Sequence, residues 1–541
     1  MKNKTSLRLR HSTSNILRSA LVLALFATAA HAAPPRPAAP LPPLKQIGQI
    51  RPRASADGAS PRIGIGFEKL DRDVFDPEKA YDKVAAIGVK WVRIQSGWQR
   101  TEKTKGRYDF AWLDSIVDNL LKRGMTPWMC LCYGNEIHTP AAAKIFGAVG
   151  VPPVKTDEER QAWANYVTAT VSHFKGRVPL YEIWNEPDQL NCWKHGVNPA
   201  EYGRFAIATA AAIRAADPAA QIAAGAVTNT LKCLPFLAAA LDTGMGARID
   251  AFTYHYYDIT ELGYAHRYES VKALLHSHNP KIKLIQGESG AQSRPDGKGA
   301  LRHLAWTPRK QAKLLLRHLV TDISLGVEFT SYFSTIDMIE ALDGKVGDKA
   351  SYLDYGYFGV LGADFDADGR STGDYTPKPA YYALQNLCAT FTADVRMAPL
   401  PVQIIPGQTP SPHGPETSIS SADGAALQYH GLKKTNGACA FVYWNATDIL
   451  TTDYAATLSF VFSNLPRPVR LVDLMTGAVY EIPDAMLTRD KKSDTCTLHN
   501  LRLADYPLML TFGDFIPFDP KPAPAAIAID DDLPMRKSGL P

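Results

Sequence analysis

The sequence predicts an α/β protein in which a (β/α)8 TIM barrel is followed by a C-terminal all-β sandwich domain. Between residues 62 and 391, short apolar segments alternate eight times with helical patterns, as a parallel barrel requires. After residue 392 the chain changes to short β-rich segments separated by turn residues, without a helical period. Several barrel segments end in polar residues, and the carboxyl ends of barrel strands are where active sites lie.

The barrel elements follow one another in order, and capping residues mark four helix starts, namely Asp76, Thr156, Asn198 and Thr307. Prolines at the first helical position or a glutamate three residues after the cap strengthen these signals. The expected strands cover residues 62–67, 89–98, 126–133, 180–187, 221–227, 250–257, 283–290 and 328–337. The expected helices cover residues 77–87, 112–123, 156–175, 199–217, 268–278, 308–325 and 379–389, with a further helix starting at Leu234.

The main alternative architecture is a doubly wound open sheet. Gly64 and Gly66 follow the first strand, but Lys69 occupies the place of the third glycine of a dinucleotide-binding loop, and no helix begins there. The barrel is therefore favoured over the open sheet. The β-rich segments of the second domain carry no cluster of acids, bases or ligands, which predicts a structural role for it; they cover residues 425–432, 438–445, 455–462, 469–474, 495–501 and 508–512.

The first 32 residues have the features of a signal peptide. Basic residues precede an apolar run at residues 20–30, and Ala30-His31-Ala32 is a small-x-small cleavage site. We therefore expect a secreted or periplasmic protein. Residues 33–61 are rich in proline and alanine and predict a linker; residues 62–391 then form the barrel, 392–518 the β-sandwich domain and 519–541 a flexible tail.

Composition narrows the choice of partners. The chain has 541 residues, enough for more than one domain, and a formal net charge of +5. The signal segment contains five basic and no acidic residues, so the charge without it is +5 minus +5, or zero. This balance predicts no nucleic-acid partner. No later segment is long and apolar enough for a membrane anchor, and nothing implies a protein partner.

Seven cysteines in an exported protein suggest disulfides, although the odd number leaves at least one unpaired or intermolecular. Cys130 and Cys132 alternate within one predicted strand and are poorly placed to join each other. Two other pairs lie on neighbouring connections or in the same β-rich region. The expected disulfides are Cys192 with Cys233 and Cys439 with Cys496.

No metal or cofactor is expected. The cysteines lack the spacing of a zinc site. The acidic stretch at residues 364–374 imitates the first half of a calcium loop, with Asp364, Asp366 and Asp368, but Tyr375 stands where the bidentate glutamate would be. A turn-rich loop is the favoured interpretation, and calcium binding stays open.

Two glutamates each close an apolar strand, one in Trp184-Asn185-Glu186-Pro187 and the other in Gly287-Glu288-Ser289-Gly290. His255 and Tyr257 stand two residues apart at the end of another strand, and so face the same way. The carboxyl ends of barrel strands meet at one rim, which brings these side chains together. A pair of carboxylates there predicts acid/base chemistry.

With these motifs the chain resembles the clan A glycoside hydrolases, and most closely family 39, which includes β-xylosidases, α-L-iduronidases and endo-glycosidases of exopolysaccharide. Arg93 on the second strand and Pro377-Lys378-Pro379-Ala380-Tyr381-Tyr382 before the last helix add to the resemblance. The resemblance implies that Glu186 is the general acid/base and Glu288 the nucleophile of a retaining mechanism, with carboxyl groups about 5–5.5 Å apart.

The resemblance also implies supporting roles. Tyr257 would orient Glu288, with packing as a rim aromatic as the alternative, and Asn185 would bind the sugar 2-hydroxyl. Arg93 would support the nucleophile electrostatically, or would simply pair with an acidic side chain in the barrel mouth, and the two are compatible. His255 is either a substrate contact or a structural histidine. The remaining candidate substrate contacts are Trp98 and Tyr332, each with core packing as the alternative, and Tyr133 and Asn135 at the end of the third strand.

Two departures from the clan pattern concern the substrate rather than the reaction. Tyr133 stands where a histidine is usual after the third strand, and Tyr332-Phe333 where a tryptophan is usual on the eighth. We therefore expect an exported retaining glycoside hydrolase that cleaves β-glycosidic bonds of a poly- or oligosaccharide, with endo action as the hypothesis. The alternatives are an exo-acting β-glycosidase such as a β-xylosidase, a transglycosidase, and a non-catalytic carbohydrate-binding protein.

Overall fold

The computed structural model describes residues 44–228, 233–406, 426–450 and 454–520. The expected signal peptide and nearly all of the expected tail lie outside the described residues. Within the described ranges no helix is both long enough and apolar enough to cross a membrane.

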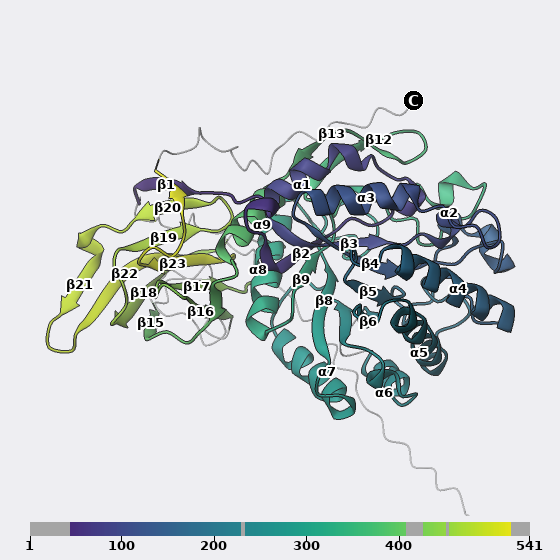
Figure 1. Ribbon diagram of the computed structural model, residues 1–541. Helices are drawn as coiled ribbons and strands as arrows, with labels where there is room; N and C mark the ends of the chain where they lie inside the picture. The colour runs from purple at the N-terminus through teal and green to yellow at the C-terminus, as the bar shows by residue number, and fades with distance from the viewer. Residues whose placement is uncertain (1–43, 229–232, 407–425, 451–453, 521–541) are drawn as a thin grey trace, which may run out of the picture.

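Eight parallel strands close into the predicted barrel (Figure 1). Each strand pairs with the next one along the chain, and the last pairs with the first. Each of these strands overlaps the range expected for it from the sequence. Their bounds are β2 Ser60–Gly66, β3 Val89–Gln95, β4 Thr126–Leu131, β5 Leu180–Ile183, β6 Gln221–Val227, β7 Ala251–His255, β8 Lys283–Ser289 and β9 Thr330–Tyr332.

The helices surround the barrel, and the four predicted N-caps each accept a backbone hydrogen bond at the start of a helix. The α-helices are α1 Tyr81–Ile87, α2 Trp98–Thr101, α3 Ala111–Lys122, α4 Asp157–His173, α5 Pro199–Ala216, α6 Leu234–Leu241, α7 Tyr264–His278, α8 Pro308–Leu325 and α9 Pro379–Thr390. Short 3-10 turns add η1 Ser55–Asp57, η2 Leu70–Arg72, η3 Pro77–Lys79, η4 Pro140–Lys144, η5 Phe146–Ala148, η6 Met245–Ala247, η7 Lys349–Ser351 and η8 Asp484–Met486.

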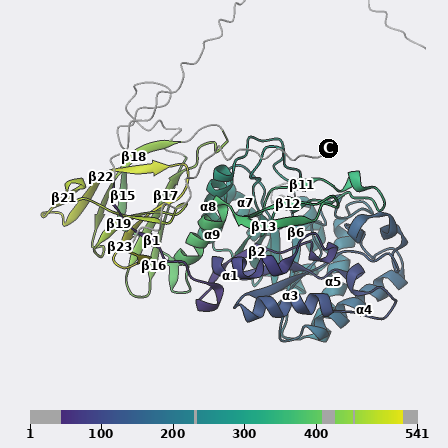
Figure 2. The same cartoon turned by 90° about the horizontal axis from the view of Figure 1, so that it is seen from above.

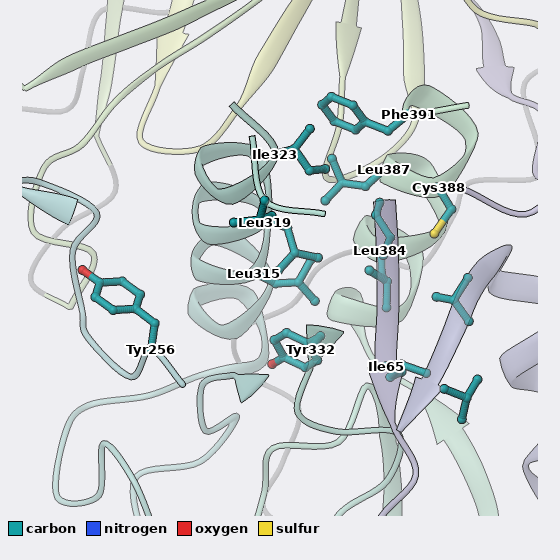
Figure 3. Close-up of a cluster of buried hydrophobic side chains, with 14 of the residues drawn as sticks. Ile65, Tyr256, Leu315, Leu319, Ile323, Tyr332, Leu384, Leu387, Cys388 and Phe391 are labelled. Carbon is teal, nitrogen blue, oxygen red and sulfur yellow. The ribbon is translucent and has the colours of Figure 1, made fainter. Parts of the chain in front are cut away.

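The hydrophobic core has an inner and an outer layer. Apolar side chains from consecutive strands fill the inside of the barrel, as in a packed core rather than a pore. A second layer lies between the barrel and its helices; in Figure 3, Leu315 and Leu319 of α8 and Leu384 of α9 lie near Ile65 and Tyr332. The inner layer consists of Trp128, Leu180, Ala223, Ala251, Ile285 and Phe329.

Two short antiparallel hairpins follow β9 and were not predicted. They are formed by β10 Met338–Ile339 with β11 Tyr355–Gly356, and by β12 Leu361–Phe365 with β13 Ser371–Pro377. The second hairpin contains the acidic stretch. At its turn the Asp366 carboxylate accepts hydrogen bonds from the backbone N–H groups of Asp368 and Arg370.

The C-terminal region consists of antiparallel sheets that pack face to face, beside α8 and α9 (Figures 1 and 2). Aromatic side chains join the two layers, as where the rings of Tyr443 and Phe460 lie 4.9 Å apart. The larger sheet has the order β14-β16-β17-β23-β19-β20-β1-β24 and the smaller β15-β18-β22-β21. The strands not yet given are β14 Val395–Met397, β15 Val402–Pro406, β16 Leu427–Lys434, β17 Cys439–Asn445, β18 Ala455–Ser463, β19 Val469–Asp473, β20 Ala478–Glu481, β21 Leu487–Asp490, β22 Thr495–Ala504, β23 Leu508–Phe512 and β24 Phe518–Asp519.

The expected linker at residues 33–61 is wrong in its second half. Strand β1 (Gln46–Ile50) pairs antiparallel with β20 and β24, although it precedes the barrel in the chain. The proline and alanine around this segment suggested a linker, because the hydrogen-bond partners of the strand come more than 400 residues later in the chain. The larger sheet therefore contains one strand that precedes the barrel in the sequence and strands that follow it.

A buried polar junction fixes the β-domain to the barrel. Arg317 of α8 donates to Glu261 in the loop after β7 at 2.7 Å, and both side chains are fully buried. Trp444 of β17 donates to the same carboxylate at 2.6 Å, so the contact joins the two domains. Nearby, Lys313 pairs with Asp505 at 2.8 Å.

Neither expected disulfide forms, and all seven cysteines, each within the described residues, are thiols. Cys439 lies in the larger sheet and Cys496 in the smaller one. Cys192 faces the barrel mouth, where its sulfur lies 3.6 Å from a carboxylate oxygen of Glu186. As predicted, no disulfide joins Cys130 and Cys132, although their sulfurs lie 3.6 Å apart because β4 ends at Leu131, between them.

Candidate active site

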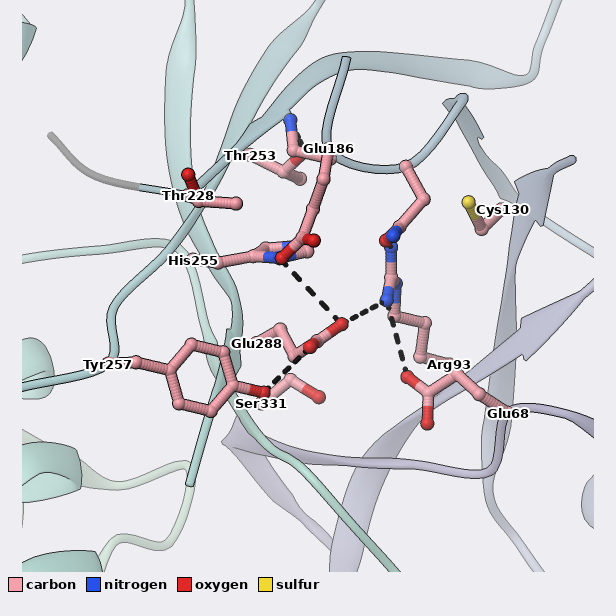
Figure 4. A network of polar contacts seen from close by, with 12 residues as sticks. Glu68, Arg93, Cys130, Glu186, Thr228, Thr253, His255, Tyr257, Glu288 and Ser331 are labelled. Carbon is pink, nitrogen blue, oxygen red and sulfur yellow. Dashed lines mark hydrogen bonds and ion pairs between the residues drawn. The ribbon is translucent and has the colours of Figure 1, made fainter. Parts of the chain in front are cut away.

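Glu186 stands at the barrel rim just after β5. Trp184 and Glu186 both have positive φ angles, 68° and 47°, which non-glycine residues rarely adopt. Hydrogen bonds from their N–H groups to Leu131 and Ala226 hold this turn. The strand thus ends abruptly, and the glutamate side chain points into the mouth of the barrel (Figure 4).

Glu288 lies opposite, near the end of β8. One of its carboxylate oxygens accepts a hydrogen bond from the Tyr257 hydroxyl at 2.7 Å, and the other accepts from Arg93 at 2.7 Å (Figure 4). Oxygens of Glu186 and Glu288 lie within 4.8 Å of each other. This separation fits the close pair of a retaining glycosidase and is shorter than the roughly 6.5–9.5 Å of inverting enzymes.

The surroundings push the two carboxyl groups toward different protonation states. Burial raises the pKa of Glu186, the charge of Glu288 adds to this, and the hydrogen bond from His255 only partly offsets the rise. Burial alone would also raise the pKa of Glu288, but the charges of His255 and Arg93 and the Tyr257 hydrogen bond outweigh it and lower that pKa. A pair of this kind provides one acid and one anion.

Arg93 of β3 is the centre of a buried ion network. Besides Glu288, its guanidinium donates to Glu182 at 2.6 Å and to the Asn185 amide oxygen at 2.8 Å, and it lies 3.4 Å from Glu68. Arg93 thus contacts the expected nucleophile Glu288 and also pairs with another acid of the barrel, so both expected roles are compatible. Four acceptors around one guanidinium fix its position.

Sequence reasoning missed Glu182 and Glu68. Glu182 lies inside the apolar strand β5, and a charged residue in a buried strand signals a buried partner, here Arg93. Glu68 follows β2 in a loop with no such pattern. Burial raises the pKa of Glu68 to about 7, although the charge of Arg93 opposes this.

His255 lies between the two carboxylates. Its Nδ1 is 2.8 Å from Glu186 and 3.7 Å from Glu288, and the ring is fully buried. Burial lowers the pKa of the imidazole, but the two carboxylates outweigh this and raise it. The histidine therefore contacts both carboxylates directly. The sequence had suggested either a structural histidine or a sugar contact, and neither expectation included this arrangement.

The structure brings the predicted supporting residues Tyr257 and Asn185 to the same place. The bond from Tyr257 to Glu288 is the one expected. Asn185 directs its oxygen to Arg93 and its nitrogen toward the Cys192 sulfur at 3.9 Å. Contact of Asn185 with a sugar hydroxyl stays a prediction.

Four other predicted contacts are buried in protein. Asn135 donates to the backbone carbonyls of Trp98 and Glu102 and caps its own turn, while the Tyr332 hydroxyl lies against Ala291. Trp98 stacks on His138 and Tyr166 at 5.3 Å. These placements favour packing over substrate contact for Asn135 and Tyr332, whereas Trp98 and Tyr133 also line a cavity.

Glu186, His255 and Glu288 are also the residues whose donor atoms could hold a metal ion, since the three atoms lie within 4.8 Å. The Arg93 guanidinium already lies against Glu288 at 2.7 Å, where its charge competes with that of a cation. The donor set therefore fits an acid/base pair better than a metal centre. No cofactor is needed for the chemistry of such a pair.

Loops after β4 and β9 meet over one side of the barrel mouth. Phe146 N–H donates to the Gly344 carbonyl at 2.9 Å, and the Phe146 ring stacks on Tyr352 at 4.4 Å. Lys194, in the loop after β5, donates to the Leu342 carbonyl at 2.9 Å. Because β9 neighbours β2 and lies across the barrel from β4 and β5, these contacts bridge the rim above β2, β3 and β4.

Comparisons with known proteins show similarity to glycoside hydrolases. Residues 77–281 match the model of Glycosyl hydrolases family 39. A β-xylosidase of Geobacillus stearothermophilus is 30% identical over 186 residues, which are 31% of this chain and 35% of that protein. The chain thus spans about a third of the length of this relative.

Solved structures share the fold at low identity. A family 39 glycoside hydrolase from Bacteroides cellulosilyticus WH2 has a TM-score of 0.58 at 17% identity, covering 85% of this chain and 82% of that one. The family 39 enzyme of Xanthomonas axonopodis pv. citri gives 0.55 at 16% identity, covering 86% and 95%. A monomeric β-xylosidase of Caulobacter crescentus CB15 gives 0.53 at 16%, covering 86% and 97%.

The barrel has the same fold as these glycoside hydrolases, and its glutamates stand at the ends of β5 and β8. The segment that matches the family model contains the strand that leads to Glu186. Over residues 77–281 the chain is similar to glycosyl hydrolase family 39, and a β-xylosidase is a 30% identical relative.

Proposed function

We propose that this chain is a retaining glycoside hydrolase that cleaves β-glycosidic bonds of a poly- or oligosaccharide. The observation that carries the proposal is the close pair of Glu186 and Glu288, within 4.8 Å and with pKa values pushed apart. A carbohydrate-binding protein has no use for such a pair. The match of residues 77–281 to the family 39 model supports the same class of reaction.

In the first step Glu288 attacks the anomeric carbon while Glu186 gives its proton to the leaving oxygen. The glycosidic bond breaks and a glycosyl ester of Glu288 forms. Arg93 and Tyr257 hold the attacking carboxylate in place and keep it ionised. In the second step water attacks the ester, and Glu186 takes a proton from that water.

The two steps need opposite behaviour from Glu186, and the site supplies a reason for the change. The negative charge of Glu288 helps to keep Glu186 protonated. When Glu288 becomes an ester its charge is lost, so the pKa of Glu186 falls and the group becomes a base for the attacking water. The acid of the first step thus becomes the base of the second.

We infer two finer points, the location of the protein and its mode of cleavage. The signal-like segment at residues 1–32 supports export to the periplasm or the exterior. The contacts that bridge the rim above β2–β4, together with the β-xylosidase name of the relative, favour exo action on the end of a chain over the endo action expected from sequence. A transglycosidase would use the same residues.

The test is turnover of a panel of aryl β-glycosides and xylo-oligosaccharides by the full chain, Glu186→Ala and Glu288→Ala, each with and without azide. Loss of the acid/base lowers turnover by on the order of 10²–10⁴. Azide should then give a β-glycosyl azide with Glu186→Ala and an α-glycosyl azide with Glu288→Ala. Glu136→Ala, which removes an exposed rim carboxylate, is the matched control and should stay active.

The outcomes separate the alternatives. Release of single sugars from the first time points supports exo action, and a ladder of oligosaccharides supports endo action. Products dominated by transfer to an added sugar acceptor would identify a transglycosidase. If the full chain binds oligosaccharides without cleaving any, and neither alanine variant changes that binding, the hydrolase proposal fails.

A further inference from the structure

A cavity of about 160 Å³ lies among the loops that follow β2, β3 and β4. Trp98 and Tyr133 form part of its wall, and Gly147 of the bridging loop closes one side. Pockets for drug-sized ligands measure about 300–1,000 Å³, so this cavity suits one sugar unit or its substituent rather than a long chain.

The cavity wall is positively charged. Arg72, Arg100 and Lys103 contribute three cations, and Asp71 contributes one carboxylate. Asp71 is already paired with Arg72 at 3.3 Å, and the side chains of both are almost fully buried. The wall therefore keeps an excess of positive charge, which is unusual for a site that takes only neutral sugars.

Some polar groups of the wall are left without protein partners. Arg72 uses its Nε for Asp71 and one terminal nitrogen for Gln95, and its other terminal nitrogen has no hydrogen bond among the described residues. The buried side-chain oxygen of Gln99 likewise has no partner there. A free guanidinium donor beside a free amide acceptor can bind a carboxylate or ester oxygen together with a hydroxyl group.

The cavity adjoins the machinery of the proposed reaction. The Tyr133 ring lies edge-on to Trp184, 5.5 Å between centroids, two residues before Glu186. On the other side, the Arg72 guanidinium donates to Gln95, which lies two residues beyond Arg93 on β3. A sugar in the cavity would therefore belong to the same chain as a sugar held at the carboxylates.

We propose that this cavity is a subsite for a sugar unit that carries an anionic group, either the carboxylate of a uronate or a sulfate ester. The proposal rests on the proposed function for its link to catalysis, but binding itself does not require turnover. Arg72 and Arg100 supply the fixed charges at the wall, and Lys103 supplies an exposed one at the edge. The substrate of the enzyme would then be an acidic rather than a neutral glycan.

Binding of D-glucuronate, D-glucose 6-sulfate and D-glucose to the full chain tests the proposal by ligand-observed NMR titration. At least one anionic sugar should bind about tenfold more tightly than glucose, and the preference should shrink as salt is added. The tighter of the two anions identifies the group. The double variant Arg100→Gln/Lys103→Gln should lose most of the preference.

Lys105→Gln/Arg107→Gln is the matched control, because it removes two exposed cations of the same turn that do not line the cavity. The proposal fails if glucose binds as well as both anions, or if the control loses the preference to the same extent as the double variant. Separate turnover assays distinguish failure of the subsite proposal from failure of the hydrolase proposal. Anion binding with no hydrolysis of any panel member would contradict the hydrolase proposal alone.

Discussion

Glu186 and Glu288 are identical side chains, and only their surroundings separate their roles. Tyr257 and Arg93 both contact Glu288, whereas Glu186 has the His255 ring and the Cys192 thiol as its neighbours. His255 contacts both carboxylates and lowers the pKa of each. The balance of acid and base at this site therefore depends on one buried histidine.

Replacing this histidine should move the whole pH profile. Glu186 acts while protonated, so its pKa sets the alkaline limb of kcat/KM, and Glu288 acts while ionised, so its pKa sets the acid limb. His255→Phe removes a group that lowers both pKa values, so both limbs should shift to higher pH. The measurement is kcat/KM against pH with whichever aryl glycoside the full chain cleaves.

A second buried histidine provides the control for this prediction. His318 on α8 contacts neither Glu186 nor Glu288, and burial lowers its pKa to about 4, so it is neutral in the assay range. His318→Phe should leave both limbs in place. If both limbs stay unchanged in the His255 variant, with its fold intact by circular dichroism, His255 does not lower the pKa values of Glu186 and Glu288.

At the scale of single elements, the helix starts were predictable because their signals are local. A cap and its acceptor lie within four residues, as in Thr156, whose hydroxyl accepts from the Glu159 N–H at 3.1 Å. The strand ends that carry Glu186, His255 and Glu288 were predictable for the same reason. Each side chain closes its own apolar run.

Features that depend on distant residues were not predictable. Strand β1 forms by pairing with β20, which is more than 400 residues away. Glu68 and Glu182 can be recognised as part of the site only from their ion pairs with Arg93. The expected disulfides failed because spacing in the sequence says little about which sheet a cysteine joins. The contacts between the loop after β9 and the loops after β4 and β5 also depend on closure of the barrel, which brings these distant segments together.

The cap of α4 offers a quantitative test at this scale. Thr156→Ala removes the acceptor for the Glu159 N–H and should cost about 1 kcal/mol in local stability. The amides of the first turn of α4 should then exchange with solvent about fivefold faster. Thr156→Ser retains the hydroxyl and should exchange almost as slowly as the unmodified chain; equal rates in the two variants would rule out the cap as the cause.

For the whole molecule, the junction between barrel and β-domain matters most. Glu261 accepts from Arg317 and from Trp444, so one buried carboxylate ties α8 to β17. Removing one partner of a buried pair leaves the other charge unpaired in the interior, which costs about 3–5 kcal/mol.

Glu261→Ala should therefore lower the thermal midpoint of the full chain clearly, as measured by scanning calorimetry. The comparison variant is Glu328→Ala, which breaks the half-exposed pair with Lys283. Such a surface pair contributes about 0–1 kcal/mol, so this variant should stay close to the unmodified chain. A Glu261→Ala midpoint no lower than that of Glu328→Ala would mean that the junction does not stabilise the assembly.

Strand β1 also bears on how the chain is made. It leaves the ribosome before the barrel, yet its neighbours β20 and β24 are synthesised only after the barrel is complete. Until then the backbone donors and acceptors of β1 lack the two strands with which they pair in the finished sheet. Pairing of β1 joins residues more than 400 positions apart, and contacts of such long range are the kind that slow folding.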